Sequence, residues 1–337
     1  MSSSNHIKNV ALVGATGFQG KHIAAELLKR GTFNITAITR SNSTTLPAGI
    51  TPAVVDYNDH ASIVAALRGQ DVIIITLSVR APPDTHQKLV DAAADAGVKL
   101  IVPNEWGYDA ERDPEFTKNT IVGEKAVKNR EHIRTKGIPF IGVNGGFWYE
   151  FSLGGDEARY GFDFNKNTLT IFDEGNIKIS TSTWEQVARG VAGVLSLKIN
   201  PDGPDDKSPT VSSFYNQSVC VESFNLSQKD MFESVKRVTG TTDADWTVTH
   251  ENSKERYGRA MGFLAANDFH LGPAASTAMR GLGMAMYTCA FFPNSPASMP
   301  DIKNEVLGLP KEDLDACTKK GIEYGKAGGV YGGNTDA

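Results

Sequence analysis

The feature that most constrains the fold is a glycine-rich turn close to the N-terminus. An apolar run of strand length, residues 9–13, leads into Gly14, Gly17 and Gly20, and a helical pattern begins directly after them. Glycines so placed permit a tight turn, close approach of backbone amides to a phosphate and close packing of helix on strand. The helix N-terminus adds unpaired N–H donors and a favourable dipole. The stretch therefore predicts a binding site for a dinucleotide's pyrophosphate, with an ordinary glycine turn as the alternative.

Strand-like and helix-like stretches alternate along the first half of the chain. The strand-like stretches are residues 33–39, 50–56, 71–78, 98–102 and 138–143, and the helix-like ones between them include residues 61–67 and 85–96. The nearly continuous apolar run at residues 72–75 is typical of a parallel sheet that is covered on both faces. We therefore predict an α/β fold with a doubly wound parallel sheet of the Rossmann type. Ligands bind where such strands end, and this rule points to Asp56, Thr76 and Leu77 among others.

The segment after the second predicted strand indicates which dinucleotide binds. NAD-binding folds usually place an acidic residue there for the ribose 2′-hydroxyl, whereas an Arg accommodates a 2′-phosphate. Here Arg40 is followed by Ser41 and Asn42, with no acid nearby. Arg40 can pair with a phosphate, and Ser41 can add a hydrogen bond. The chemistry favours NADPH, and a solvated surface Arg is the alternative.

A second motif follows the fifth predicted strand, where residues 103–109 read Pro-Asn-Glu-Trp-Gly-Tyr-Asp. Together with the glycine turn, this motif resembles the isoflavone reductase-like branch of the NmrA-like family of atypical short-chain dehydrogenases/reductases, in which Pro-Ser-Glu-Phe-Gly-x-Asp is typical. Asn104 and Trp106 depart from that pattern. The resemblance covers residues 1–155 well and the remainder of the chain only in general layout.

The resemblance implies an NADPH-dependent reductase of secondary metabolism that transfers hydride to a small apolar substrate, aromatic or polyketide-like. It also implies a lysine as proton donor on the helix before Gly137. The start of that helix selects Lys125, whereas counting back from Gly137 brings Lys128 near the position, and a solvated helical face is a third interpretation. Two rival functions remain: an NmrA-like regulator that senses NAD(P) without catalysis, and a lyase or isomerase on the same fold.

The Tyr-x-x-x-Lys chemistry of classical short-chain dehydrogenases is excluded on residue identity. No tyrosine in the chain is followed by a lysine four residues later. A lysine that acts directly, or through a water, is the proton carrier that the resemblance leaves.

The predicted site combines the turn, the strand ends and an aromatic segment. The predicted cofactor-binding residues are Gly14, Thr16, Gly17, Phe18, Gln19, Gly20, Arg40, Ser41, Asp56, Thr76, Leu77, Asn104, Glu105 and Lys125, of which Lys125 is also the predicted catalytic residue. The predicted substrate-binding residues are Trp106, Phe147, Trp148 and Tyr149. Aromatic side chains after two glycines suit a flat apolar substrate, and a hydrophobic cluster that joins two domains is the equal alternative.

Length and composition set the remaining expectations. A chain of 337 residues suggests a dinucleotide-binding domain over residues 1–155, a substrate-binding region over residues 156–330 that returns a strand to the main sheet in one interpretation, and a mobile tail over residues 331–337. The net charge of -5 offers no basic patch to nucleic acid, and no apolar run approaches the roughly 18 residues of a membrane span. Three scattered cysteines predict reduced thiols in a cytoplasmic protein, and no His/Cys/Asp spacing indicates a metal site. The sequence leaves open whether the chain forms a homodimer.

Overall fold

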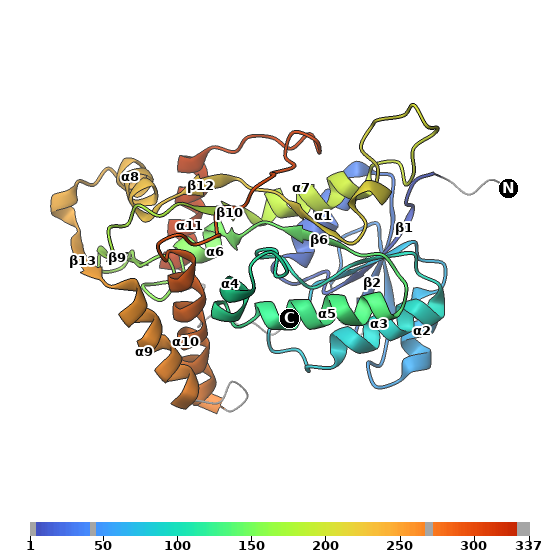
Figure 1. Ribbon diagram of the computed structural model, residues 1–337, viewed down its shortest axis with the longest axis horizontal. Coiled ribbons are helices and arrows are strands. Elements are labelled where there is room, and N and C mark those ends of the chain that lie inside the picture. Colours follow the sequence, from blue (N-terminus) through green and yellow to red (C-terminus); the bar gives the residue numbers. More distant parts are fainter. Residues whose placement is uncertain (1–4, 41–44, 267–271, 329–337) are drawn as a thin grey trace.

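The computed structural model describes residues 5–40, 45–266 and 272–328. The predicted cofactor residue Ser41 and the predicted tail at residues 331–337 lie outside the described residues. A parallel sheet with its helices occupies one end of the molecule, and a second region of helices and short strands occupies the other (Figure 1).

The N-terminal half builds the predicted parallel sheet. Its strands, in spatial order, are β3 (Ile50–Val54), β2 (Asn34–Thr39), β1 (Asn9–Val13), β4 (Val72–Ile75) and β5 (Leu100–Val102). Phe140 bridges in parallel to Ile101 of β5, and the strand that follows it, β6 (Ile141–Asn144), pairs in parallel with β11 (Gln217–Cys220). The doubly wound α/β fold is thereby confirmed. Its strand order reverses between β1 and β4, where ligands bind in folds of this kind.

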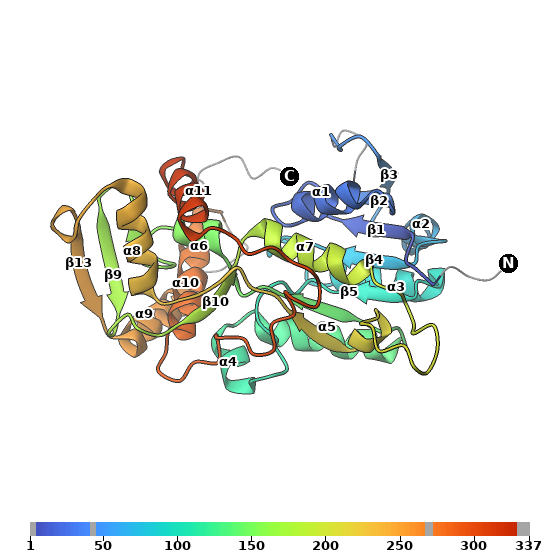
Figure 2. The same ribbon diagram turned by 90° about the horizontal axis from the view of Figure 1, so that it is seen from above.

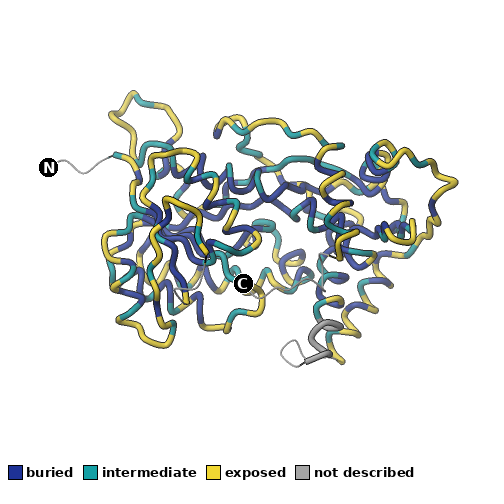
Figure 3. Tube along the Cα trace, turned by 180° about the vertical axis from the view of Figure 1, so that it is seen from behind, coloured by how far each residue is buried: buried dark blue, intermediate teal, exposed yellow. Residues whose placement is uncertain are grey.

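Helices cover both faces of this sheet. On one face α1 (Gly20–Arg30) packs beside α7 (Trp184–Leu195), and on the other lie α2 (His60–Leu67), α3 (Thr85–Ala96) and α5 (Gly123–Thr135) (Figure 1). Val10 and Leu12 of β1 belong to the core on the side of α1 and α7, and Ala11 and Val13 belong to the core on the side of α2 and α3. Figure 3 shows the same pattern as buried strands beneath more exposed connections. A strand that is buried on both sides needs no polar face, which explains the continuous apolar runs.

The second region packs short strands against helices around a core of its own (Figure 2). One small sheet contains β7 (Phe147–Trp148), β10 (Ile179–Ser182) and β12 (Phe224–Leu226), and another contains β8 (Phe162–Asp163), β9 (Thr168–Phe172) and β13 (Thr247–Glu251). The other helices of the chain are α4 (Pro114–Asn119), α6 (Tyr149–Leu153), α8 (Gln228–Thr239), α9 (Ser253–Ala266), α10 (Gly272–Ala290) and α11 (Leu314–Lys326), with short 3-10 helices at Ser212–Phe214 and Asp243–Asp245.

The chain crosses between the two regions more than once. Helix α7 and strand β11 follow residue 155 in the sequence, yet α7 packs on α1 and β11 pairs with β6. A domain boundary at residue 155 stays a prediction. Within the described ranges, none of the helices combines the length and apolar character that crossing a membrane requires.

Candidate functional site

The glycine turn between β1 and α1 leaves no room for side chains. Gly14 has a φ of +75°, and a Cβ there would lie 2.1 Å from the carbonyl oxygen of Thr76. A Cβ on Gly20 would lie 1.9 Å from the carbonyl oxygen of Gly14. The Thr76 hydroxyl donates to the carbonyl oxygens of Val13 (2.6 Å) and Gly14 (3.1 Å), which ties the turn to the end of β4. Any residue larger than glycine at these two positions would therefore displace the turn.

The turn offers backbone amides that are not used within the fold. The N–H group of Gly17 closes the turn by donating to the carbonyl oxygen of Gly14 (2.9 Å). Among the described residues, the N–H groups of Thr16, Phe18 and Gln19 find no protein acceptor, and the first turn of α1 carries no acidic side chain. Free amides at a helix N-terminus attract an anion. This is the cradle that a pyrophosphate requires.

Two other predicted cofactor residues lie where neighbouring strands end. Arg40 follows β2 and Asp56 follows β3, and both are exposed. Burial raises the pKa of Tyr57, and the positive charge of Arg40 opposes that rise, so Arg40 extends toward the end of β3. The Asp56 carboxylate accepts a hydrogen bond from the N–H of Asn58 (2.8 Å). Contact of either side chain with a ribose phosphate stays a prediction.

The Asn104 side chain joins the ends of β4 and β5. Its Oδ1 accepts the N–H of Leu77 (3.0 Å), and its Nδ2 donates to the carbonyl oxygen of Leu77 (3.2 Å). The same Oδ1 accepts the indole N–H of Trp106 (3.1 Å), whose side chain is buried in the core. Asn104 and Trp106, the two departures from the family motif, are therefore hydrogen-bonded to one another and hold Leu77 in place.

The Glu105 carboxylate is buried against Arg130 of α5. The guanidinium approaches both carboxylate oxygens, with Nε 2.8 Å from Oε2 and Nη2 2.8 Å from Oε1. Burial raises the pKa of Glu105 to about 7, although the charge of Arg130 opposes the rise. Room for the pair comes from Gly142 of β6, where a Cβ would lie 2.1 Å from Oε1 of Glu105. The predicted cofactor residue Glu105 thus makes an ion pair within the protein, and a direct cofactor contact stays a prediction.

The same guanidinium donates hydrogen bonds to three further side chains. Nη1 of Arg130 donates to Asp109 (2.9 Å) and Glu111 (3.0 Å), and Nη2 donates to the Ser218 hydroxyl on β11 (2.7 Å). Arg134 pairs with both oxygens of Glu111 from outside (2.6 and 2.8 Å). The acidic residues of the motif after β5 therefore attach this segment to α5 and to the sheet edge.

Lys125 and Lys128 both lie exposed on α5, and the charge of Lys125 acts on the buried His86. Burial, with the positive charges of Lys125 and His132, lowers the pKa of His86 to about 4, so this imidazole is neutral. His86 Nε2 accepts the N–H of Asn104 at 3.5 Å. Lys125 therefore lies on the side of α5 that approaches the ends of β4 and β5.

The predicted substrate residues after β6 point to different places. Phe147 stacks on Tyr287 with ring centroids 4.0 Å apart, and the Tyr149 hydroxyl hydrogen-bonds that of Thr318 (2.8 Å), so both belong to the core of the second region. Trp148 instead lies beside Trp184, whose ring stacks on Phe18 of the glycine turn. Phe147 and Tyr149 therefore fit the alternative of a hydrophobic cluster, whereas Trp148 stays a candidate for contact with the substrate.

Trp148 belongs to a group of rings that we call the turn cluster. Its members are Phe18, His22, Trp148, Phe151, Trp184 and Tyr324. Trp184 is central: its ring stacks on Phe18 (5.9 Å, 8°) and lies 6.1 Å from Trp148. Sequence reasoning missed His22, Phe151, Trp184 and Tyr324. The Trp148–Phe151 spacing of one helical turn was the signal for Phe151, and no local signal places Trp184 or Tyr324 beside the turn.

Several described residues of the candidate site have buried polar atoms without a partner. Within the described residues they include Oε1 of Gln19, both side-chain polar atoms of Asn144, the indole N–H groups of Trp148 and Trp184, and Nδ1 of His86. Buried polar groups are nearly always hydrogen-bonded, so these atoms indicate that water or a ligand completes the site. The free turn amides and these atoms fit a bound dinucleotide and a small partner molecule.

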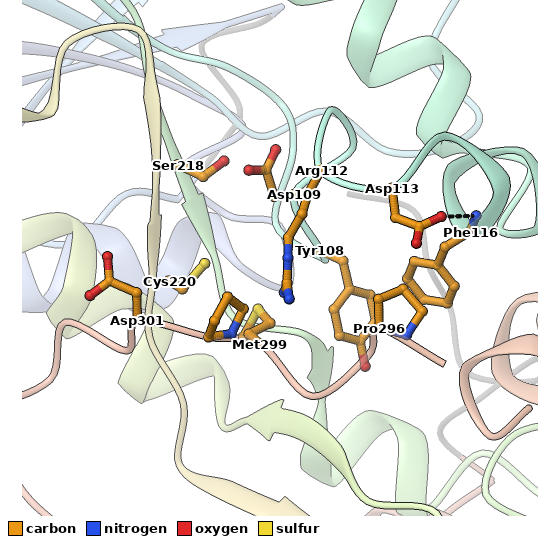
Figure 4. Close-up of a pocket in the computed structure, with 11 residues that line it drawn as sticks. Tyr108, Asp109, Arg112, Asp113, Phe116, Ser218, Cys220, Pro296, Met299 and Asp301 are labelled. Carbon is orange, nitrogen blue, oxygen red and sulfur yellow. Dashed lines mark hydrogen bonds between the residues drawn. The ribbon is translucent and has the colours of Figure 1, made fainter. Parts of the chain in front are cut away.

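A separate pocket of about 150 Å³ lies beside the motif after β5, and Arg112 extends into it between Asp109 and Tyr108 (Figure 4). Its polar walls are already engaged, because Asp109 binds Arg130 and the Tyr108 hydroxyl donates to the carbonyl oxygen of Ser180 (3.0 Å). None of the predicted site residues lines it. The described part of the chain also contains no group of His, Cys, Asp and Glu suited to a metal ion.

Comparisons with known proteins agree with this geometry. Residues 6–152 match the NmrA-like family. Oxidoreductase aprR of Aspergillus flavus is 26% identical over 314 residues, which cover 91% of this chain and 96% of the relative. Isoflavone reductase homolog IRL of Zea mays is 32% identical over 157 residues, covering 43% of this chain and 50% of the relative.

The fold is also that of a solved reductase. The structure of AtPrR2 with NADP+ and (+)pinoresinol superposes with a TM-score of 0.70 at 18% identity, over 93% of this chain and 98% of that one. The family match, the full-length oxidoreductase relative and the shared fold lead to one conclusion. The chain is an oxidoreductase whose residues 6–152 match the NmrA-like family and which is similar to isoflavone reductase homologs.

Proposed function

We propose that the chain is an NADPH-dependent reductase that acts on a small, flat, apolar substrate. The observation that carries the proposal is the meeting of the turn and the turn cluster: Phe18 of the glycine turn and Trp148 of the predicted substrate segment both contact the ring of Trp184. A dinucleotide on the turn amides would have an aromatic wall beside it. Aromatic walls of this kind hold flat apolar molecules by stacking.

Different residues would bind different parts of the cofactor. The amides of Thr16, Phe18 and Gln19 would hold the pyrophosphate, and the exposed Arg40 would pair with a 2′-phosphate and select NADPH over NADH. When bound, the cofactor supplies the hydride. The AtPrR2 complex, which contains NADP+ and an aromatic ligand, supports this assignment through the shared fold.

Lys125 supplies the proton in this proposal. It lies on the side of α5 that approaches the ends of β4 and β5, and its charge reaches the neutral imidazole of His86. A general acid of this kind contributes roughly 10²–10⁴-fold to the rate.

The test follows NADPH absorbance after mixing the protein with phenolic, quinone and enone compounds. Stoichiometric oxidation is expected with at least one flat aromatic substrate. At saturating NADPH, Lys125→Ala should lose about 10²–10⁴-fold in kcat, whereas the control Lys128→Ala should not. A Lys125→Ala enzyme that turns over at the wild-type rate contradicts the proton-donor role. Tight NADPH binding without oxidation by any compound would favour a sensor instead.

Two further predictions concern the cellular location and the oligomeric state. A cytoplasmic location agrees with the three cysteines, which are all free thiols. It is tested by fractionation of cells that express the chain. A homodimer is tested by light scattering of the purified protein.

A further inference from the structure

One residue in the connection between α4 and α5 has a strained backbone. Ile121 has a φ of +67°, in the left-handed region that favours glycine. The other non-glycine residues with a positive φ in the described ranges are all Asp or Asn, whose short polar side chains tolerate this conformation. A β-branched side chain crowds the backbone there, so surrounding contacts must hold Ile121 in place.

The contacts that hold Ile121 come from the second region. Its side chain packs against a group of buried residues that we call the alanine socket, which consists of Ala158, Ala260 of α9, and Met284 and Ala285 of α10. The short side chains of the three alanines accommodate the branched side chain of Ile121. Burial of this apolar side chain therefore offsets the strain of its backbone.

Further contacts hold the end of α4 against the start of α5. The Tyr257 hydroxyl of α9 donates to the carbonyl oxygen of Asn119 (3.1 Å), and the Thr120 hydroxyl donates to the carbonyl oxygen of Thr117 (2.9 Å). Helix α5 begins at Gly123, where a Cβ would lie 2.7 Å from Cγ2 of Thr117. The start of α5 thus lies directly against α4, which α9 in turn contacts.

The first turn of α5 has little support of its own. Its N-cap residue, Val122, provides no side-chain hydrogen bond to the helix, and the bond from the Ala126 N–H to the Val122 carbonyl oxygen is long, at 3.4 Å. Arg130, which attaches α5 to the sheet edge, lies in a later turn. A helix end without a cap depends on tertiary contacts for its position. Lys125 lies in this first turn, four residues after Ile121.

We propose that Ile121 is a positioning residue: its packing in the alanine socket sets the direction of the first turn of α5 and thereby places Lys125. The effect on catalysis rests on the proposed role of Lys125 as proton donor, whereas the position of the helix turn does not. Because the socket is built from residue 158, α9 and α10, the second region and the proton donor are connected through this side chain.

The first test examines the helix turn without any activity. Amide hydrogen exchange, followed by mass spectrometry, should be faster in Ile121→Asn than in the wild type at residues 126–128, whose hydrogen bonds close the first turn, and unchanged at residues 131–135. Asn adopts a positive φ readily, so this variant removes the apolar contact without adding backbone strain. Ile121→Ala, which buries no polar group, should exchange in the same way, and Ile121→Val should stay close to the wild type.

The matched control is Val122→Asn, a similar change at the exposed neighbouring residue. It should not speed exchange, because Asn is a favourable N-cap residue. Unchanged exchange in both Ile121→Asn and Ile121→Ala, or equal acceleration in Val122→Asn, overturns the proposal.

The second test examines the effect on the proton donor. In Ile121→Asn, kcat should fall roughly 10- to 100-fold with KM for NADPH little changed, because a small displacement of a catalytic group can cost that much. Ile121→Val should retain most of kcat. In the Lys125→Ala background, Ile121→Asn should cause no further loss, because both substitutions remove the same contribution. A loss of equal size in both backgrounds overturns the positioning role. A protein that reduces no substrate defeats the reductase proposal alone, because the exchange results do not depend on turnover.

Discussion

Glu105 and Glu150 are both buried glutamates beside the candidate site, and they differ in what faces them. Glu105 faces the guanidinium of Arg130, which reaches both of its oxygens. Neither oxygen of Glu150 receives a hydrogen bond within the described residues. Burial raises the pKa of each, to about 7 and about 8 respectively. Similar burial therefore gives a fixed ion pair in one case and a stored proton in the other.

The difference separates a part of the site whose charges do not change with pH from a part whose charge does. The segment after β5 is attached to α5 and β11 by Arg130, whose charge cannot be removed at any ordinary pH. Glu150, in the segment after β6, becomes charged in mildly alkaline solution, because burial raises its pKa to about 8. Each of the following changes alters one side of this comparison and leaves the other intact.

The largest effect is expected from Arg130→Met. The substitution leaves Glu105 buried without a cation and removes the partner of Asp109, and breaking a buried ion pair costs about 3–5 kcal/mol. Urea unfolding of the purified variant measures this loss. A loss below about 1 kcal/mol would mean that Glu105 does not depend on Arg130. Further substitution of Glu105 by Gln should restore part of the stability, because the uncompensated charge is then gone.

The next effect is a pH-dependent gain in Glu150→Gln. The pKa of Glu150 is raised in the fold from an ordinary 4.5 to about 8, so its contribution is fully present below about pH 4.5 and is lost as pH rises through 8. The variant has no such loss. It should match the wild type near pH 4.5 and become more stable by about 2–4 kcal/mol at pH 8–9. Unfolding free energies at several pH values check this, and parallel curves for the two proteins would contradict it.

The smallest effect is expected from Arg134→Gln. Arg134 is partly exposed and pairs only with Glu111, so the loss should be about 0.2–1 kcal/mol. This variant is the matched control for Arg130→Met, since both remove one guanidinium from α5. Equal losses of unfolding free energy in the two variants would show that burial does not decide how much each arginine contributes to the stability of this cluster.

The sequence was sufficient to predict those parts of the fold that depend on neighbouring residues. The strand, turn and helix at Gly14–Gly20 and the parallel strands follow from residue spacing and apolar runs, because backbone geometry permits few alternatives at three glycines in such a context. The motif after β5 was also visible. Its physical role was not, because Arg130 is 25 residues away from Glu105 along the chain.

Contacts between distant segments account for what could not be predicted. Trp184 reaches the glycine turn because α7 packs on α1, and Trp148 reaches Trp184 from the segment after β6. No periodicity in the sequence encodes either contact. The aromatic segment after β6 is split for the same reason. Phe147 and Tyr149 pack in the core of the second region, whereas Trp148 lies beside Trp184. That this segment lines a substrate site stays a prediction.

The most direct test of the central claim, that NADPH binds on the glycine turn, is titration of the protein with NADPH and NADH, followed by tryptophan quenching. Trp184 is a suitable reporter because its ring stacks on Phe18 of the turn. NADPH should bind more tightly than NADH, Arg40→Ala should weaken NADPH by about 10- to 100-fold while leaving NADH unchanged, and Gly20→Val should lose both while keeping the wild-type circular dichroism. Equal binding of NADH and NADPH, unaffected by Arg40→Ala, would contradict the cofactor assignment. Normal binding by Gly20→Val would contradict the site itself.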